Sequence, residues 1–179
     1  MFVMKKIICA LILLISVPAF VSAQTWKVYS SEISFQIKNA GLTVTGRFSG
    51  LKADLIFNPA DLAKSALSAS VEVATIKTGI DKRDKDLMAE KYFNADKYKL
   101  IEVKSTKLFK KGSQYSGMFN VIIKGVTKQV EIPFEFTNSG NEGTFKGSFQ
   151  INRRDFGVGG SSMMMSDNLT VNILVKAKS

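Results

Sequence analysis

The stretch NRRDFGVGGSSMMMSD, residues 152–167, holds two adjacent arginines, a DFG tripeptide, clustered glycines and three consecutive methionines. An Asp-Phe-Gly tripeptide binds magnesium in protein kinases, where an H-R-D loop and a paired strand lysine accompany it. The chain contains no histidine, so that loop is missing. We therefore do not interpret residues 155–157 as a metal site.

The arginines and the acid of this stretch have a structural interpretation. We expect residues 145–156 to form one strand, with Asp155 at its end pairing with Arg153, Arg154 or Arg83. The glycines at 157, 159 and 160 could form a backbone-amide nest for phosphate. No lysine-serine pair or helix signature follows them, so a mobile loop is favoured.

Three methionines follow the glycines. Met163, Met164 and Met165 show no period, and methionine is a flexible, polarisable side chain that suits adaptable apolar surfaces. Two interpretations remain open. Either the methionines line the entrance to the interior of the fold, or they belong to a loop that covers one end of the fold.

The missing histidine limits the chemistry of the whole chain. It removes imidazole bases, Ser-His-Asp triads and nearly all zinc, copper and haem-iron sites. The single cysteine, Cys9, lies in an apolar leader, and no loop carries acidic ligands at alternate positions. We therefore expect a non-enzymatic protein without metal or cofactor; carboxylates, lysines and tyrosines would have to serve any enzymatic alternative.

The leader predicts export. Lys5 and Lys6 precede an apolar run over residues 7–17, and Val21-Ser22-Ala23 offers small residues for cleavage, as in a secretory signal peptide. The run is too short for a membrane span, which needs ~20 residues. We predict a signal peptide over residues 1–23, a periplasmic protein and one domain over residues 24–179.

The charge is basic. Without the two leader lysines, 23 lysines and arginines stand against 15 acids, which suits an anionic partner such as a lipid head group or an acidic glycan. A solvated basic surface explains the charge equally well. Lys107, Lys110 and Lys111 resemble strand-end and turn lysines, so we expect no nucleic-acid partner.

Apolar residues alternate with polar ones along most of residues 33–175. This period of two predicts strands with one apolar face, over residues 33–37, 42–48, 51–57, 67–73, 101–103, 115–123, 130–136, 145–151 and 169–175. Short turns rich in glycine and asparagine separate several of them. The pattern predicts an all-β protein, an antiparallel barrel of about eight strands.

One charged segment, residues 81–98, breaks the alternation. It would form the long crossover between the two halves of the barrel. Residues 84–91 predict a short helix with Leu87 and Met88 inward and Asp81 or Asp84 as its N-cap.

The predicted interior is rich in aromatic residues and interrupted by glycines. Gly46, Gly117 and Gly147 share the inward face, where glycine leaves volume that a packed core would fill. A packed barrel and an apolar tunnel both remain open. The tunnel would be lined by Phe35, Phe48, Phe57, Phe119, Val121, Phe134 and Phe149, with Met163, Met164 and Met165 at its mouth.

Four segments resemble, in order, the signatures of the YceI family. They are GRFSGLKADLIFNPADL, SVEVATIKTGIDKRDKDLMAEKYFNADKYKLIEVKST, GMFNVIIKGVTKQVEIPF and FQINRRDFGVG. The resemblance implies an extended lipocalin-like barrel whose tunnel holds a polyisoprenoid or another long-chain amphiphile. Many members carry histidines where this chain has Ser31 or Glu32 and Asp86, so any role of those histidines is absent.

We therefore expect binding, transport or storage of an isoprenoid or fatty-acyl lipid. Arg83 and Arg154 are the expected contacts for an anionic head group. Transient membrane contact and a homodimer remain open. The alternative is a packed barrel whose basic outer surface binds an anionic glycan or a membrane.

Overall fold

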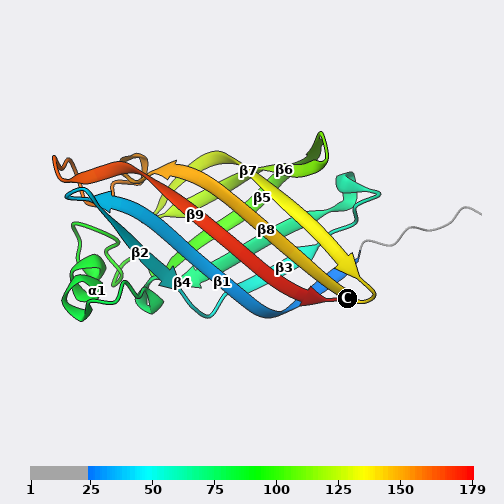
Figure 1. Ribbon diagram of the computed structural model, residues 1–179, viewed down its shortest axis with the longest axis horizontal. Coiled ribbons are helices and arrows are strands. Elements are labelled where there is room, and N and C mark those ends of the chain that lie inside the picture. The colour runs from blue at the N-terminus through cyan, green and yellow to red at the C-terminus, as the bar shows by residue number, and fades with distance from the viewer. Residues whose placement is uncertain (1–23) are drawn as a thin grey trace, which may run out of the picture.

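The computed structural model describes residues 24–179 and is built almost entirely of antiparallel strands (Figure 1). The predicted signal peptide lies outside the described residues. The strands are β1 (Thr25–Asn39), β2 (Leu42–Phe48), β3 (Lys52–Ile56), β4 (Ala66–Glu72), β5 (Leu100–Lys111), β6 (Gln114–Ile123), β7 (Val126–Ser139), β8 (Glu142–Asn152) and β9 (Met165–Lys178). The helix α1 spans Asp81–Met88, and three 3₁₀ turns, η1 (Leu62–Lys64), η2 (Val73–Thr75) and η3 (Arg153–Phe156), complete the elements.

The strands close into a barrel with eight positions around its axis. Each strand from β3 to β9 pairs with the next, and β9 pairs with β1. Both β2 and β3 pair with β1, β2 along its second half and β3 at its first residues, so the two share one position. The predicted all-β fold, an extended barrel of about eight strands with one short helix, is confirmed.

Two-residue hairpins connect several strands because their sequences tolerate positive φ. Ala40 and Gly41 turn β1 into β2 with φ of 50° and 78°, and Lys124 and Gly125 turn β6 into β7 with 53° and 75°. Paired positive φ values match the right-handed twist of the flanking strands. Both turns lie at the same end of the barrel as α1 (Figure 1).

The wall between β7 and β8 is only partly hydrogen-bonded. The two strands pair over six positions, from Phe134 opposite Gly147 to Ser139 opposite Glu142. The pairing stops at Pro133, a residue that cannot donate to a ladder. Beyond that point η3 lies against β7, and Lys124 Nζ donates to the Gly157 carbonyl at 2.9 Å.

Two predicted elements have different bounds. The helix begins at Asp81, three residues earlier than predicted, and Ile80 is its N-cap without a side-chain hydrogen bond. Residues 153–156 do not continue β8 but form η3, because the Asn152 side chain accepts a hydrogen bond from the Arg154 amide and turns the chain.

Candidate functional site

The interior of the barrel holds an elongated apolar cavity of about 270 Å³. All nine strands contribute to its wall, because every second residue of each strand points inward. Aliphatic side chains such as Leu55, Val103, Ile132 and Val171 surround it. The sequence left two alternatives, a packed barrel and an apolar tunnel, and the cavity favours the tunnel.

A cluster of aromatic rings fills the barrel at the end away from α1. Trp26, Phe57, Phe136 and Phe145 meet there with ring centroids 4.7–6.3 Å apart. The Trp26 indole Nε1 donates to the Phe57 carbonyl at 3.0 Å, so its polar atom is satisfied in the core. We call these four residues the aromatic plug, and they close one end of the cavity.

The structure brings most of the predicted lining residues together. Phe35, Phe48, Phe119, Val121, Phe134 and Phe149 all line the cavity. Phe57 does not, which corrects that assignment: its side chain is fully buried in the aromatic plug. Phe57 follows the end of β3, so its height along the barrel places it in the plug, below the open part of the cavity.

Two of the three inward glycines leave no space. A Cβ at Gly46 would enter the ring of Phe35, its partner on β1. A Cβ at Gly117 would lie 2.6 Å from both Leu108 and Phe119. Gly147 alone of these glycines borders the cavity. The volume that Gly46 and Gly117 release is thus filled by neighbouring side chains, and the cavity arises elsewhere.

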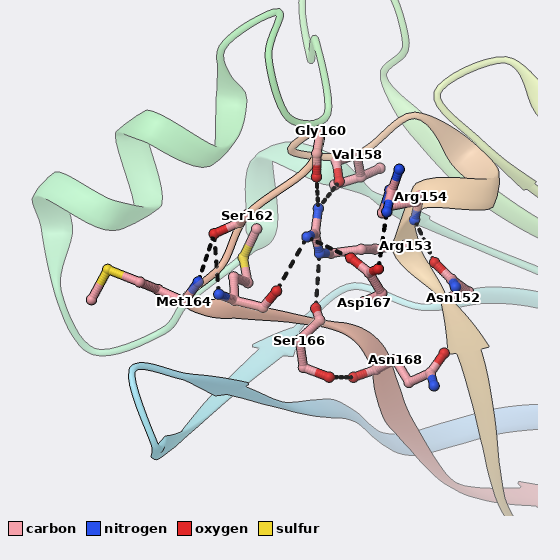
Figure 2. Close-up of polar contacts among 11 residues, drawn as sticks. Asn152, Arg153, Arg154, Val158, Gly160, Ser162, Met164, Ser166, Asp167 and Asn168 are labelled. Carbon is pink, nitrogen blue, oxygen red and sulfur yellow. Dashed lines mark hydrogen bonds and ion pairs between the residues drawn. The ribbon is translucent and has the colours of Figure 1, made fainter.

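Because the aromatic plug fills the opposite end, we place the mouth of the cavity at the α1 end. Leu87 of α1, Tyr92 and Phe93 of the crossover and Met165 of β9 line it there. Met163 and Met164 do not line the cavity; they are solvent-exposed. Only one of the three predicted mouth methionines therefore points inward, and Met164 extends away from the loop in Figure 2.

A buried arginine organises the loop beside the mouth. The Arg153 side chain is 3% exposed and donates to the carbonyls of Val158, Gly160, Met165 and Ser166 at 2.6–3.3 Å (Figure 2). Its Nη2 also lies 2.9 Å from Asp167 Oδ1. The same carboxylate pairs with Arg154 at 3.2 Å. The predicted ion pairs of Asp155 are absent among the described residues, since Asp167 takes both arginines and Asp155 is exposed.

The two predicted head-group arginines differ in position. Arg83 lines the cavity near its mouth, whereas Arg154 does not. Arg83 Nε donates to Thr78 Oγ1 at 2.8 Å and Nη2 to the Thr78 carbonyl at 2.7 Å. Nη1 makes no hydrogen bond within residues 24–179. Arg153 also lines the cavity, but carbonyls and Asp167 occupy its donors.

Asp84 holds Thr78, and through it Arg83, in place. Its Oδ1 accepts hydrogen bonds from the Thr78 hydroxyl at 2.5 Å and the Thr78 amide at 2.8 Å. The Thr78 hydroxyl bond, followed by the Thr78 amide and the nearby Lys77 and Arg83 charges, lowers the pKa of Asp84 below its usual value despite the opposing effect of burial. The carboxylate is therefore ionised at neutral pH.

Sequence reasoning missed several residues of the site. Trp26 was not predicted because a register shift between Val28 and Ser30 moves the inward positions from even to odd residue numbers. The start of β1 therefore does not follow the period of two seen in the rest of the strand. Tyr92 and Phe93 lie in the irregular crossover, where no periodicity exists. Aromatic residues in an otherwise charged segment were the available signal.

The cavity wall is predominantly apolar, and its titratable side chains are Arg83, Tyr92, Lys146 and Arg153. No aspartate or glutamate lines it within residues 24–179. The described part of the chain also has no cluster of three or more acidic, histidine or cysteine side chains that could hold a metal. Its helices include none long and apolar enough to cross a membrane.

These features define a class: an extended antiparallel barrel, plugged at one end, with an apolar cavity that opens beside a short helix. The family described as the YceI-like domain matches residues 26–177. The chain belongs to this family, as the four sequence segments indicated.

Known relatives and structures agree with this assignment. A UPF0312 protein of Serratia proteamaculans is 28% identical over 133 residues, 70% of this chain and 69% of the relative. One from Vibrio cholerae is 26% identical over 169 residues, 87% of this chain and 89% of the relative. The crystal structure of Burkholderia cenocepacia BcnA shares the fold, with a TM-score of 0.79 at 23% identity, over 83% of this chain and 96% of that one. A polyisoprenoid-binding domain from Saccharophagus degradans superposes with a TM-score of 0.66 at 14% identity, over 87% and 97%.

Proposed function

We propose that this protein binds an isoprenoid or fatty-acyl lipid inside its barrel and shields the chain for transport or storage without catalysing a reaction. The observation that carries the proposal is the cavity of about 270 Å³ with an apolar lining. Each buried CH₂ group stabilises a bound chain by ~0.8 kcal/mol. The described polyisoprenoid binding of the Saccharophagus degradans domain, which shares this fold, supports an isoprenoid ligand.

We also propose a periplasmic place of action, because of the leader sequence. The predicted signal peptide and the absence of cysteine from residues 24–179 are compatible with a periplasmic protein. There a lipid carrier has a physical task, because a free hydrocarbon chain is insoluble in the aqueous space between two membranes.

An anionic head group would lie at Arg83. This side chain lines the cavity near the mouth, and its Nη1, which makes no hydrogen bond within residues 24–179, would donate to a phosphate or carboxylate oxygen. A guanidinium also keeps its charge at every physiological pH. Arg154 is excluded from this role by its position outside the cavity.

The alternative function, binding through a basic outer surface, assumed a packed barrel. The cavity argues against that assumption. An enzymatic role needs an acid or base beside the ligand; no carboxylate lines the cavity in residues 24–179, and Tyr92 and Lys146 are the remaining candidates on its wall. Binding is therefore the function that the geometry supports best.

Native mass spectrometry of the protein purified from its own periplasm tests the proposal. We expect an adduct with the mass of a prenyl or acyl lipid. The variant Ala69→Phe should lose it, because Ala69 faces the cavity and the ring would fill it. Ala66→Phe is the control, as Ala66 is exposed on the same strand. A bare wild-type protein that also takes up no added lipid would overturn the proposal.

A further inference from the structure

Large apolar side chains are exposed at the mouth end of the barrel. Leu42 is 73% exposed, Met164 65% and Ile80 53%, and Met163 is fully exposed. None of the four lines the cavity or belongs to the core. We call Leu42, Ile80, Met163 and Met164 the apolar rim.

The segments that carry the apolar rim are held together around the mouth. The Ala40 amide, in the hairpin before Leu42, donates to the Met164 carbonyl at 2.7 Å. We call residues 157–164, between η3 and β9, the methionine loop. The Gly159 amide donates to the Lys91 carbonyl at 2.9 Å, which connects this loop to the crossover after α1. Figure 1 shows the β1–β2 hairpin, α1 and the loop before β9 at one end of the barrel.

Several contacts fix the conformation of the methionine loop. Gly159, with φ of 76°, lies under the Tyr92 ring, where a Cβ would be 2.9 Å from the ring. Arg153 holds the loop through its carbonyls. The Ser162 hydroxyl accepts hydrogen bonds from the amides of Met164 and Met165 (Figure 2). This turn sends Met165 into the cavity and leaves Met163 and Met164 outside.

Basic side chains accompany the apolar rim. Lys82 and Lys85 lie on α1 beside Ile80, and Lys128 follows the β6–β7 turn at the same end. All three are exposed, and none forms an ion pair within residues 24–179. Apolar side chains flanked by lysines suit the interface of an anionic bilayer, where the former enter the acyl boundary and the latter meet the head groups.

We propose that the apolar rim docks the protein, mouth first, on an anionic lipid bilayer. A second copy of the chain is the competing occupant, and the oligomeric state of the rim variant distinguishes the two. Docking would place the open end of the cavity at the head-group level, so that a chain could pass between bilayer and barrel without crossing water. This passage rests on the proposed lipid-binding function, whereas docking itself does not.

Vesicle flotation tests the docking. We expect the wild-type protein to float with vesicles of phosphatidylcholine and phosphatidylglycerol, and the variant Leu42→Ser/Met163→Ser/Met164→Ser to bind them about tenfold more weakly or worse. The matched control is Tyr29→Ser/Ile56→Ser, which removes exposed apolar side chains at the plugged end, and it should bind as the wild type does. A second variant, Lys82→Gln/Lys85→Gln/Lys128→Gln, should weaken binding to the anionic vesicles and reduce its dependence on salt.

Three outcomes would overturn the proposal: no wild-type binding to anionic vesicles, unchanged binding of the rim variant, or equal loss in the plugged-end control. A wild-type dimer that the rim variant dissociates, with no vesicle binding, would assign the surface to a second copy instead. Uptake of a detergent-solubilised prenol separates this test from the proposed function. The rim variant should still load the prenol, and a wild-type protein that docks but never loads would refute lipid binding alone.

Discussion

The indole ring of Trp26 lies directly against the backbone of Gly143 on β8. A Cβ at residue 143 would be 2.5 Å from the ring and 3.0 Å from Phe136. A glycine in the strand interior weakens a sheet, but here its missing side chain lets the largest ring of the chain close the barrel. The two residues are far apart in sequence and together seat the aromatic plug.

Gly143→Ala should therefore destabilise the fold. The methyl group must displace Trp26 or Phe136, which costs about 1–3 kcal/mol in a well-packed core. Urea denaturation followed by tryptophan fluorescence measures the loss, with Thr144→Ala on the same strand as the control. Equal free energies of unfolding for Gly143→Ala and wild type would contradict this prediction, because the aromatic plug would then accommodate the methyl group without loss of stability.

Arg153 and Arg154 share one carboxylate yet should differ in their effect on stability. Arg153→Leu leaves several carbonyls of the mouth loop without their donor, and each buried polar group left unsatisfied costs about 1–3 kcal/mol. Arg154→Leu removes a half-exposed ion pair worth at most about 1 kcal/mol. Chemical denaturation of both variants compares them; similar losses would contradict the assigned roles.

Arg83→Gln should weaken anionic ligands selectively. A hydrogen bond to a charged group contributes about 1.5–3 kcal/mol, so affinity for farnesyl phosphate should fall ~10–100-fold. Affinity for farnesol, which has no charge, should stay within about threefold and serves as the internal control for folding. Arg154→Gln should change neither. Equal loss for both ligands would assign Arg83 a purely structural role.

Acid should destabilise the fold, because two hydrogen-bonded carboxylates lose their charge. The pKa of Asp84 is lowered by its hydrogen bonds from Thr78, and the pKa of Glu131 by hydrogen bonds from Ser116 and Lys111. A lowered folded-state pKa gives stability that is complete above the usual pKa and is lost as pH falls through the folded value. The free energy of unfolding should therefore drop as pH falls below about 4.

The variant Asp84→Asn isolates one of these carboxylates. It should be less stable than wild type at neutral pH and should lose less stability on acidification. Asp81→Asn, an exposed position on the same helical turn, should follow the wild-type curve. Denaturation at a series of pH values gives the comparison, and parallel curves for Asp84→Asn and wild type would exclude this carboxylate as the cause.

Much of the fold was predictable because a strand exposes its period locally. Inward and outward faces, the hairpins and the crossover follow from residue type and spacing, and Phe35, Phe119 and Phe149 face the interior as the alternation requires. The exception, the start of β1, fails for a local reason: the irregularity between Val28 and Ser30 reverses the alternation.

The site was only partly predictable, since alternation determines the face of a residue but not its height along the barrel. Phe57 and Phe134 both point inward, yet Phe57 lies within the aromatic plug whereas Phe134 lines the cavity. The arginine pair shows the same limit. Whether residue 153 or 154 is buried depends on η3, which interrupts the period of two after β8.

The sequence by itself determined the class of fold, its one-sided strands, its basic charge and the absence of histidine chemistry, because these depend on composition and on neighbours along the chain. Only the tertiary structure decided which end is plugged, which arginine reaches the cavity and which methionines face solvent. Those outcomes depend on contacts such as Trp26 with Gly143 and Ala40 with Met164, which bring together segments that are remote in sequence.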